Sequence, residues 1–271
     1  MKTPTILILL LFPILIMGQA GECEMFKETV GDSVFYGIKS TSYAPIEVEV
    51  IPKAIVLPKS RYQKLSLLPK MDSLIGIIRV HKSVIDTLEE GSTMGKFFSL
   101  KAYYGDTQTS KHNDDYIYAL PYEKGKKYTI TQGFNGKKSH HSIASKYALD
   151  FNMKIGDLVC AAREGVVIYT ITKFKESGGI DFINKANKIL VLHDDGTFGN
   201  YTHLNYNGAL VKKGDWVTRG QVIGYSGNTG YSGGPHLHFV VREARDISVP
   251  IFFEGYEGKI LKRRKKYKRV K

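Results

Sequence analysis

The chain has 271 residues, of which 42% are hydrophobic and 24% charged, and its formal net charge is +13 at pH 7. This length can bury one or two cores, and two domains are expected. Its two cysteines are too few for a disulfide scaffold. Beyond the N-terminus no apolar stretch reaches the roughly 20 residues of a spanning helix, so we expect the mature protein to be soluble.

The N-terminal segment is typical of an export signal. A basic start at Lys2 is followed by an apolar run over residues 6–17 and by small residues up to Ala20. We therefore predict a signal peptide at residues 1–20, cut after Ala20, and a periplasmic or extracellular protein. A lipid anchor at Cys23 is disfavoured because Glu22 stands where a lipoprotein signal has a small residue.

Residues 24–118 have strand character and carry no chemical motif. β-rich runs separated by Pro, Gly, Ser and Asp occupy residues 34–38, 46–50, 75–80 and 97–104. Several short strands at this spacing predict a β-sandwich-like domain. His81 and His112 lie in polar surroundings, and we expect both at the surface.

Residues 121–250 are predicted to form a second β-rich domain with tight glycine turns. Its expected strands include residues 128–134, 147–151, 158–162, 165–169 and 189–193. The Asp195-Gly196 step after the last of these runs predicts a hairpin. His193 precedes that turn, so we interpret it as a structural residue.

Two glycine-containing turns in this domain exclude other functions. Lys212-Lys213-Gly214 is a bare turn that lacks the flanking residues of lipoyl and biotinyl carriers. The loop at residues 227–234 lacks the Gly-Lys-Ser/Thr of a phosphate-binding loop and does not open a helix, so it does not indicate nucleotide binding. It ends next to His236, which suggests that it lines a cleft.

His236-Leu237-His238 begins an apolar run that predicts a half-buried strand. The two-residue period of a strand places both imidazoles on one face and the apolar side chains on the other. A bare His-x-His is more often a solvated pair than a metal site, so a metal hypothesis needs further ligands upstream. Asp150 and His203 are candidates, together with His140 or His141.

These residues stand in motifs whose order resembles the M23 peptidases, the lysostaphin or LytM-type zinc endopeptidases that cut cell-wall peptides. The resemblance covers about residues 122–242. It rests on motifs that are separated in the sequence, namely Ser139-His140 with Asp150, Gly156 to Gly165, Tyr201 to Leu204, Gly220 to Gly230, and Gly234 to Phe239. More loosely, residues 38–120 look like the β-sandwich that precedes the peptidase in some exported members.

The resemblance implies an antiparallel LytM-type sheet or partial barrel, similar to a duplicated hybrid motif, that binds Zn²⁺. The implied zinc ligands are His140, Asp150 and His238, with His141 as an alternative to His140. Alignment from Gln132 favours His140, which we prefer, whereas counting back from Asp150 favours His141. His203 and His236 match the family's catalytic histidines. Three protein ligands leave a fourth zinc position for water, as in catalytic zinc sites.

The function implied is hydrolysis of peptidoglycan cross-links or stem peptides. Zinc would polarise the amide carbonyl and activate water, and His203 and His236 would handle the protons. The competing class is a catalytically silent envelope protein that binds cell wall or activates another hydrolase. A β-rich binding module with chance histidines would require independent motifs to coincide in order. Nucleic acid is not expected as a partner of an exported protein, and the sequence leaves the oligomeric state open.

The positive charge is concentrated in a basic tail at residues 257–271. Nine Lys or Arg residues and no acid lie between Lys259 and Lys271, which leaves +4 for the rest of the chain. Such a tail predicts either contact with an anionic envelope surface or a disordered solvated end. Export also makes one Cys23–Cys160 bridge chemically possible, although Cys160 lies in an apolar run where a small buried hydrophobe is the preferred interpretation.

Overall fold

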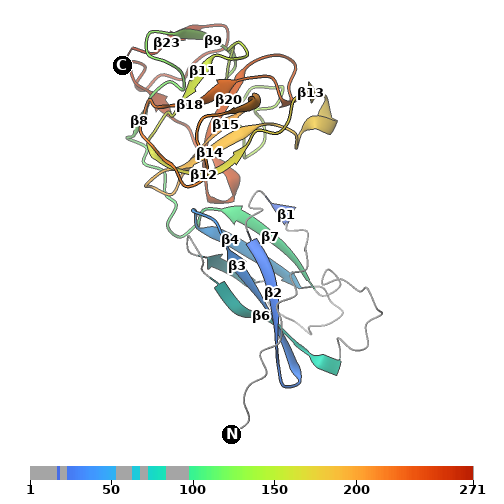
Figure 1. Cartoon of the computed structure of the whole chain (residues 1–271). Coiled ribbons are helices and arrows are strands. Elements are labelled where there is room, and N and C mark those ends of the chain that lie inside the picture. Colours follow the sequence, from blue (N-terminus) through green and yellow to red (C-terminus); the bar gives the residue numbers. More distant parts are fainter. Residues whose placement is uncertain (1–16, 19–22, 53–62, 68–72, 84–97, 271) are drawn as a thin grey trace. The chain divides into compact units, whose positions relative to one another are not determined.

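A computed structural model describes residues 17–18, 23–52, 63–67, 73–83 and 98–270. The chain divides into two compact units, Met1–Asp106 and Thr107–Lys271 (Figure 1). Regular structure in the described residues is almost entirely strand, which confirms the all-β prediction. The predicted signal segment lies outside the described residues apart from Met17–Gly18. Among the described residues, no helix has the length and apolar character needed to span a bilayer.

The first unit contains two sheets with the strand orders β1-β7-β4-β5 and β2-β3-β6. The strands are β1 (Met17–Gly18), β2 (Cys23–Val30), β3 (Ser33–Ser40), β4 (Ile46–Pro52), β5 (Gln63–Leu67), β6 (Ser73–His81) and β7 (Phe98–Tyr104). The predicted runs at residues 34–38, 46–50 and 75–80 fall within β3, β4 and β6, and β7 covers the described part of the run at 97–104. Ile38, Ile46, Val48 and Ala102 are fully buried. The sandwich arrangement of the two sheets stays a prediction.

The second unit is built on a nine-stranded sheet with the order β17-β12-β14-β15-β20-β10-β9-β23, in which β21 also pairs with β20. Its strands are β9 (Lys127–Gln132), β10 (Leu149–Phe151), β12 (Gly165–Ile171), β14 (Lys188–Leu192), β15 (Phe198–Thr202), β17 (Trp216–Val217), β20 (Leu237–Glu243), β21 (Ile247–Ser248) and β23 (Lys266–Lys268).

Smaller sheets complete this unit. A three-stranded sheet has the order β11-β18-β16, and two parallel pairs are formed by β13 with β19 and by β22 with β8. These strands are β8 (Ile117–Tyr118), β11 (Leu158–Cys160), β13 (Ser177–Gly178), β16 (Leu204–Ala209), β18 (Val222–Ser226), β19 (Gly230–Tyr231) and β22 (Phe252–Phe253). The short 3-10 helices η2 (Ile180–Phe182) and η3 (Ala244–Asp246) lie between strands.

β20 occupies the middle of the large sheet, between β15 and β10. Leu237, Phe239 and Val241 alternate along it and are fully buried in the apolar core. The Phe239 ring packs on Tyr201 of β15 at a centroid distance of 4.8 Å. Because side chains alternate across a strand, burial of this apolar set directs His238 to the opposite face.

The predicted hairpin joins β14 to β15. Gly196 adopts a positive φ of 78° at the turn, and the Asp195 carboxylate accepts hydrogen bonds from both the backbone N–H and the hydroxyl of Thr197. His193 is buried at the base of the turn, and its Nδ1 donates to the Glu164 carbonyl at 2.8 Å. His193 therefore has the structural role that the sequence predicted.

The basic tail is folded onto the second unit, which contradicts the alternative of a disordered solvated end. β23 pairs antiparallel with β9, and Leu261 is buried in the core cluster. The phenolic hydroxyl of Tyr122 donates to the Tyr267 carbonyl at 2.7 Å. The sequence did not predict this packing because basic residues dominate the tail, whereas only Leu261 and the partly buried Tyr267 contribute apolar contacts to the core cluster.

Both cysteines are buried, and neither is in a disulfide bond. Cys23 lies at the start of β2, and Cys160 ends β11. The preferred interpretation of Cys160 as a small buried hydrophobe agrees with this burial, which also raises the pKa of its thiol.

Candidate metal centre

Asp150 and His238 face each other on neighbouring strands. They form a register pair between antiparallel β10 and β20, although 88 residues separate them in the sequence. The sheet therefore brings an oxygen and a nitrogen donor together: Nδ1 of His238 lies 2.8 Å from Oδ1 of Asp150.

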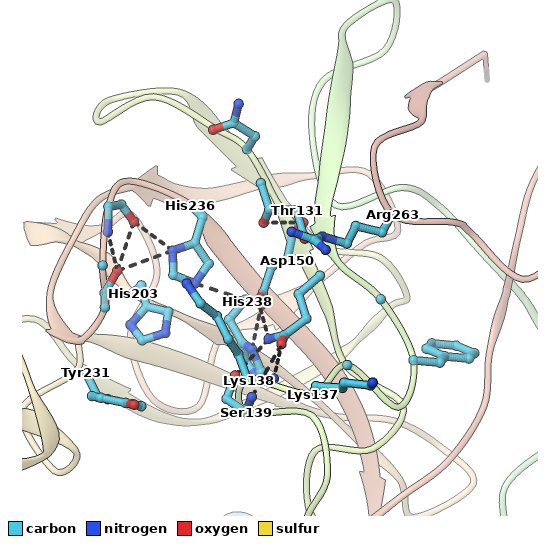
Figure 2. Close-up of a pocket in the computed structure, with 18 of the residues that line it drawn as sticks. Thr131, Lys137, Lys138, Ser139, Asp150, His203, Tyr231, His236, His238 and Arg263 are labelled. Carbon is cyan, nitrogen blue, oxygen red and sulfur yellow. Dashed lines mark hydrogen bonds and ion pairs between the residues drawn. The ribbon is translucent and has the colours of Figure 1, made fainter.

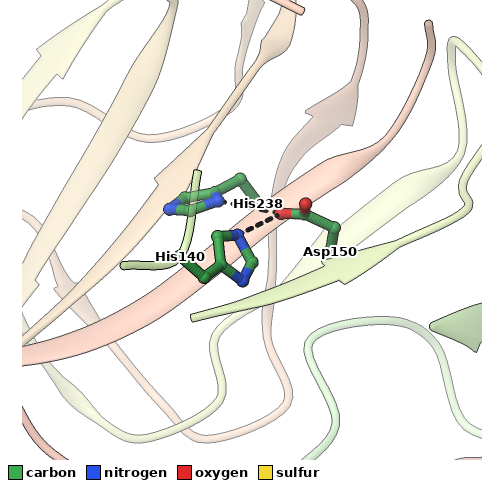
Figure 3. A group of neighbouring side chains, drawn as sticks. All are labelled: His140, Asp150 and His238. Atoms are coloured by element: carbon green, nitrogen blue, oxygen red, sulfur yellow. Dashed lines mark hydrogen bonds and ion pairs between the residues drawn. The ribbon is translucent and has the colours of Figure 1, made fainter. Parts of the chain in front are cut away.

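His140 completes a cluster with these two residues (Figure 3). It lies in the turn-rich segment between β9 and β10, where its backbone N–H donates to the Gly136 carbonyl. Its Nε2 lies 3.2 Å from the same Asp150 oxygen, and the three candidate ligand atoms lie within 4.8 Å of one another. His140 is fully buried, whereas the alternative ligand His141 is exposed and lies outside this cluster.

The donor set fits a divalent metal such as zinc. Two imidazole nitrogens and one carboxylate oxygen are ligands that zinc takes in sites with an open fourth position. Nδ1 of His140 lies 3.0 Å from the Gly133 carbonyl and must donate to it, which leaves the lone pair of Nε2 available on the cluster side. Such a second hydrogen bond fixes the tautomer and orientation of metal-binding histidines.

The protonation states also favour metal binding. Burial alone would raise the pKa of Asp150, but the adjoining imidazoles of His140 and His238 outweigh it and hold that pKa well below its usual value. Burial lowers the pKa of His238, and the contact with Asp150 only partly opposes this. Around neutral pH the cluster therefore offers an ionised carboxylate and a neutral imidazole, the forms that bind metals.

His203 and His236 lie beside this cluster (Figure 2). Their ring centroids are 4.5 Å apart, and the His203 ring lies 6.0 Å from that of His238. Nδ1 of His203 donates to the Thr229 carbonyl at 2.7 Å, and Nδ1 of His236 donates to the Gly234 carbonyl at 2.8 Å. Both rings are thus held by the loop at residues 227–234, which we call the glycine-rich loop. In each ring Nε2 remains available as a proton acceptor.

His203 sits at an unusual backbone position between β15 and β16. Its φ of 67° lies in the left-handed region that costs energy for a residue with a Cβ atom. Burial first, and then the neighbouring His236 and His238 rings, lower its pKa to about 3. His203 is therefore neutral at physiological pH and held in one orientation, as a proton acceptor requires.

Gln132 is a site residue that the sequence did not predict, because its side chain is neither charged nor a usual metal ligand. Its Nε2 donates to Oδ2 of Asp150 at 3.0 Å, and its Oε1 accepts the backbone N–H of Lys138 at 3.0 Å. A Cβ atom on Gly136 would come within 2.3 Å of the Gln132 side chain, so this loop requires glycine there. The sequence signal for Gln132 is that it opens the run Gln132 to Gly136, from which the alignment to His140 starts.

A cleft of 1190 Å³ opens beside the His140, Asp150 and His238 cluster and the neighbouring His203 and His236. One side is formed by the glycine-rich loop with Tyr231, and the other by the β9–β10 loop and residues 260–263 of the tail. Asp150, His203, His236 and His238 line it directly, as Figure 2 shows. The cleft is large enough for an extended peptide to reach all four side chains.

Fold and site together define an all-β domain with a His/Asp cluster that could hold a metal ion next to an open cleft. Residues 144–250 match Peptidase family M23. This second unit therefore carries an M23 peptidase domain. Asp150, His203, His236 and His238 lie inside the matched range, and His140 lies just before it.

Similar proteins include two curated endopeptidases. Peptidoglycan DD-endopeptidase ShyA of Vibrio cholerae is 36% identical over 121 residues, which are 44% of this chain and 26% of that protein. Glycyl-glycine endopeptidase ALE-1 of Staphylococcus capitis is 37% identical over 121 residues, which are 44% of this chain and 28% of that protein. The chain thus spans about a quarter of the length of these relatives.

The solved structure of the antimicrobial peptidase lysostaphin from Staphylococcus simulans is 32% identical and is covered to 47%, over 45% of this chain. Its TM-score of 0.35 is too low to establish a shared fold.

Proposed function

We propose that this protein is an exported zinc endopeptidase that hydrolyses peptide bonds in peptidoglycan cross-links or stem peptides. The observation that carries the proposal is the convergence of His140, Asp150 and His238 beside His203 and His236, with all of these except the buried His140 lining one cleft. The M23 domain and the names of its peptidoglycan endopeptidase relatives support the reaction class and the substrate.

His140, Asp150 and His238 would hold the metal. When bound, zinc supplies Lewis-acid polarisation of the scissile carbonyl and lowers the pKa of a coordinated water. The Gly133 carbonyl and Gln132 keep the ligand side chains oriented.

His203 and His236 would handle the protons. Nε2 of one imidazole accepts a proton from the attacking water, and a proton is then delivered to the nitrogen of the leaving amine. Burial lowers the pKa of His203 to about 3, so its imidazole is neutral and its Nε2 lone pair is free to accept a hydrogen bond from the attacking water. The hydrogen bonds from both Nδ1 atoms to backbone carbonyls keep each Nε2 directed to the cleft.

The test combines metal analysis with hydrolysis of purified peptidoglycan. We expect one zinc per chain and release of soluble fragments that stops on addition of a chelator and returns with zinc. A chain that binds zinc but releases no fragments would overturn the hydrolase in favour of an envelope-binding protein. Fragment release that survives complete metal removal would overturn the metal mechanism.

Export and domain limits belong to the same proposal. The signal peptide at residues 1–20 is checked by the N-terminal sequence of the protein recovered outside the cytoplasm, which should begin at Gly21. The proposed domains are residues 24–118 and 121–250. Limited proteolysis should cut between the two compact units, near residues 106–107, and leave two stable fragments, because β8 at residues 117–118 already pairs with β22 of the second unit.

A further inference from the structure

The basic tail builds part of the cleft that contains the candidate metal centre. Residues 260–263 line the cleft opposite the glycine-rich loop. Burial of Leu261 anchors this segment, and the backbone N–H of Arg264 donates to the Ile130 carbonyl of β9 at 2.8 Å. The segment is therefore held at the rim by core packing and by the edge of the sheet.

Four basic side chains gather on this side of the cleft. Lys137 and Lys138 come from the β9–β10 loop, and Lys262 and Arg263 come from the tail. We call these four residues the basic wall. All four are exposed, and none forms an ion pair with a carboxylate among the described residues.

The charge of the cleft is strongly one-sided. Asp150 is the only acidic residue among those that line it, and its two oxygens are engaged by His140, His238 and Gln132. The four positive charges of the basic wall thus lack a counter-charge within the cleft. Charges gathered in a cleft raise the local concentration of an oppositely charged ligand.

Arg263 is oriented rather than free to move. Its Nε donates to the Thr131 carbonyl at 3.0 Å, and Figure 2 shows the side chain extended toward Thr131. The two terminal nitrogens of the guanidinium remain for a ligand. A planar guanidinium matches a carboxylate with two parallel hydrogen bonds, so this group selects carboxylates over neutral amides.

We propose that the basic wall binds a carboxylate of the substrate, so that the enzyme prefers peptides with free carboxylates near the scissile bond over neutral glycine bridges. This inference rests on the proposed function and specifies its substrate class. The inference distinguishes the substrate of a peptidoglycan DD-endopeptidase from that of a glycyl-glycine endopeptidase, the two kinds of relative named above. A glycyl-glycine segment has no side-chain charge for the basic wall to bind.

A binding experiment tests the preference independently of hydrolysis. The probes are two fluorescent peptides of one sequence, one with free side-chain carboxylates and one with the corresponding carboxamides, titrated with the full chain and followed by anisotropy. We expect the acidic peptide to bind about five- to thirty-fold more tightly, as for one or two exposed charge contacts. The preference should weaken with added salt. Equal affinities at low salt would overturn the inference.

Paired variants locate the effect on the wall. The double variant K262Q/R263Q should lose most of the preference for the acidic peptide. K259Q/K265Q removes the same charge from the same tail, but from exposed positions that do not line the cleft, and should keep the preference. An equal loss in both variants would mean that overall charge attracts the peptide and would overturn the site.

Hydrolysis of the same two peptides distinguishes the inference from the proposed function. K262Q/R263Q should raise KM for the acidic peptide about five- to thirty-fold with little change in kcat and in zinc content. Selective binding without any hydrolysis by the zinc-loaded wild type would overturn the proposed function and leave the carboxylate site standing. Hydrolysis with equal KM for both peptides would overturn the carboxylate site alone.

Discussion

At the scale of single residues, Gln132 connects the carboxylate of Asp150 to the loop that carries His140. It donates to Oδ2 of Asp150 and accepts the backbone N–H of Lys138, so one side chain orients two candidate ligands. Groups that orient metal ligands contribute substantially to metal affinity although they never touch the ion.

Replacing Gln132 should therefore weaken metal binding. We expect Gln132→Ala to lower zinc affinity about 10- to 100-fold, as for other groups that orient a ligand. Competition with a chromophoric chelator measures the change. Gln221→Ala is the control, because Gln221 accepts a hydrogen bond from Thr218 in an exposed turn away from the cluster. Equal zinc affinity in both variants would show that Gln132 does not orient the ligands.

The site histidines should have separable roles. His203→Ala should keep zinc and lose about 100- to 10,000-fold in kcat, because it removes a proton acceptor and no ligand. Asp150→Ala and His238→Ala should lose zinc as well as activity. Metal content and hydrolysis are measured on the same samples. A fully active His203→Ala variant would contradict its assignment.

At the scale of elements, the β14–β15 hairpin contains a buried histidine that links stability to pH. Burial lowers the pKa of His193 to about 4, while the unfolded chain titrates near the ordinary value. As pH falls from about 6.5 to about 4, His193 becomes protonated in the unfolded state while it stays neutral in the folded state. Stability is therefore lost over that window, by at most about 3 kcal/mol.

Urea unfolding between pH 7.5 and pH 4.5 checks this expectation. His193→Gln should flatten the fall in unfolding free energy over that range, whatever its effect at pH 7.5. Replacement of the exposed His141 by Gln should leave the pH dependence as in the wild type. Identical slopes for wild type and His193→Gln would show that another group governs acid stability.

The tail provides a second test at this scale, through two adjacent residues with opposite environments. Leu261 is 3% exposed and packs in the core cluster, whereas Ile260 is 57% exposed. Leu261→Ala should lower the free energy of unfolding by about 2–4 kcal/mol, because it opens a cavity. Ile260→Ala should change it by less than about 0.5 kcal/mol. Similar small effects would mean that the tail is not anchored.

At the scale of the whole molecule, metal binding should stabilise one unit alone. The candidate ligands all lie in the unit Thr107–Lys271. Zinc at about 1,000 times its Kd should add about 4 kcal/mol to the unfolding free energy of that unit. In calorimetry of the full chain, zinc should raise the unfolding temperature of one transition and leave any transition of the other unit in place. Asp150→Ala should abolish the shift.

The sequence predicted those parts of the molecule that depend on local sequence patterns, such as alternation of apolar residues and turn dipeptides. The alternation of apolar and polar residues predicted β20, and the Asp195-Gly196 step predicted the β14–β15 hairpin. The position of His140 could not be derived in this way, because the loop between β9 and β10 has no periodicity and adjacent His140 and His141 satisfy the same spacing. Gln132 escaped because an uncharged amide acquires its role only when the sheet places it against Asp150.

The tail illustrates a different limit. Because basic residues dominate the tail, the sequence predicted neither the burial of Leu261 nor the pairing of β23 with β9. That pairing joins residues more than 130 positions apart. No window along the sequence contains both partners. Its location at the cleft could therefore be found only from the folded chain.

The pairing of β10 with β20 also has a consequence for the order of events during synthesis. A growing chain that has passed residue 151 has made β10 with Asp150, but β20 with His238 emerges almost 90 residues later. Until then the candidate metal centre lacks one ligand, and the rim formed by residues 260–263 is missing as well. A partly made or prematurely terminated chain should thus be inert toward peptides, and cutting ability should arise only after the domain has been made through to its basic tail.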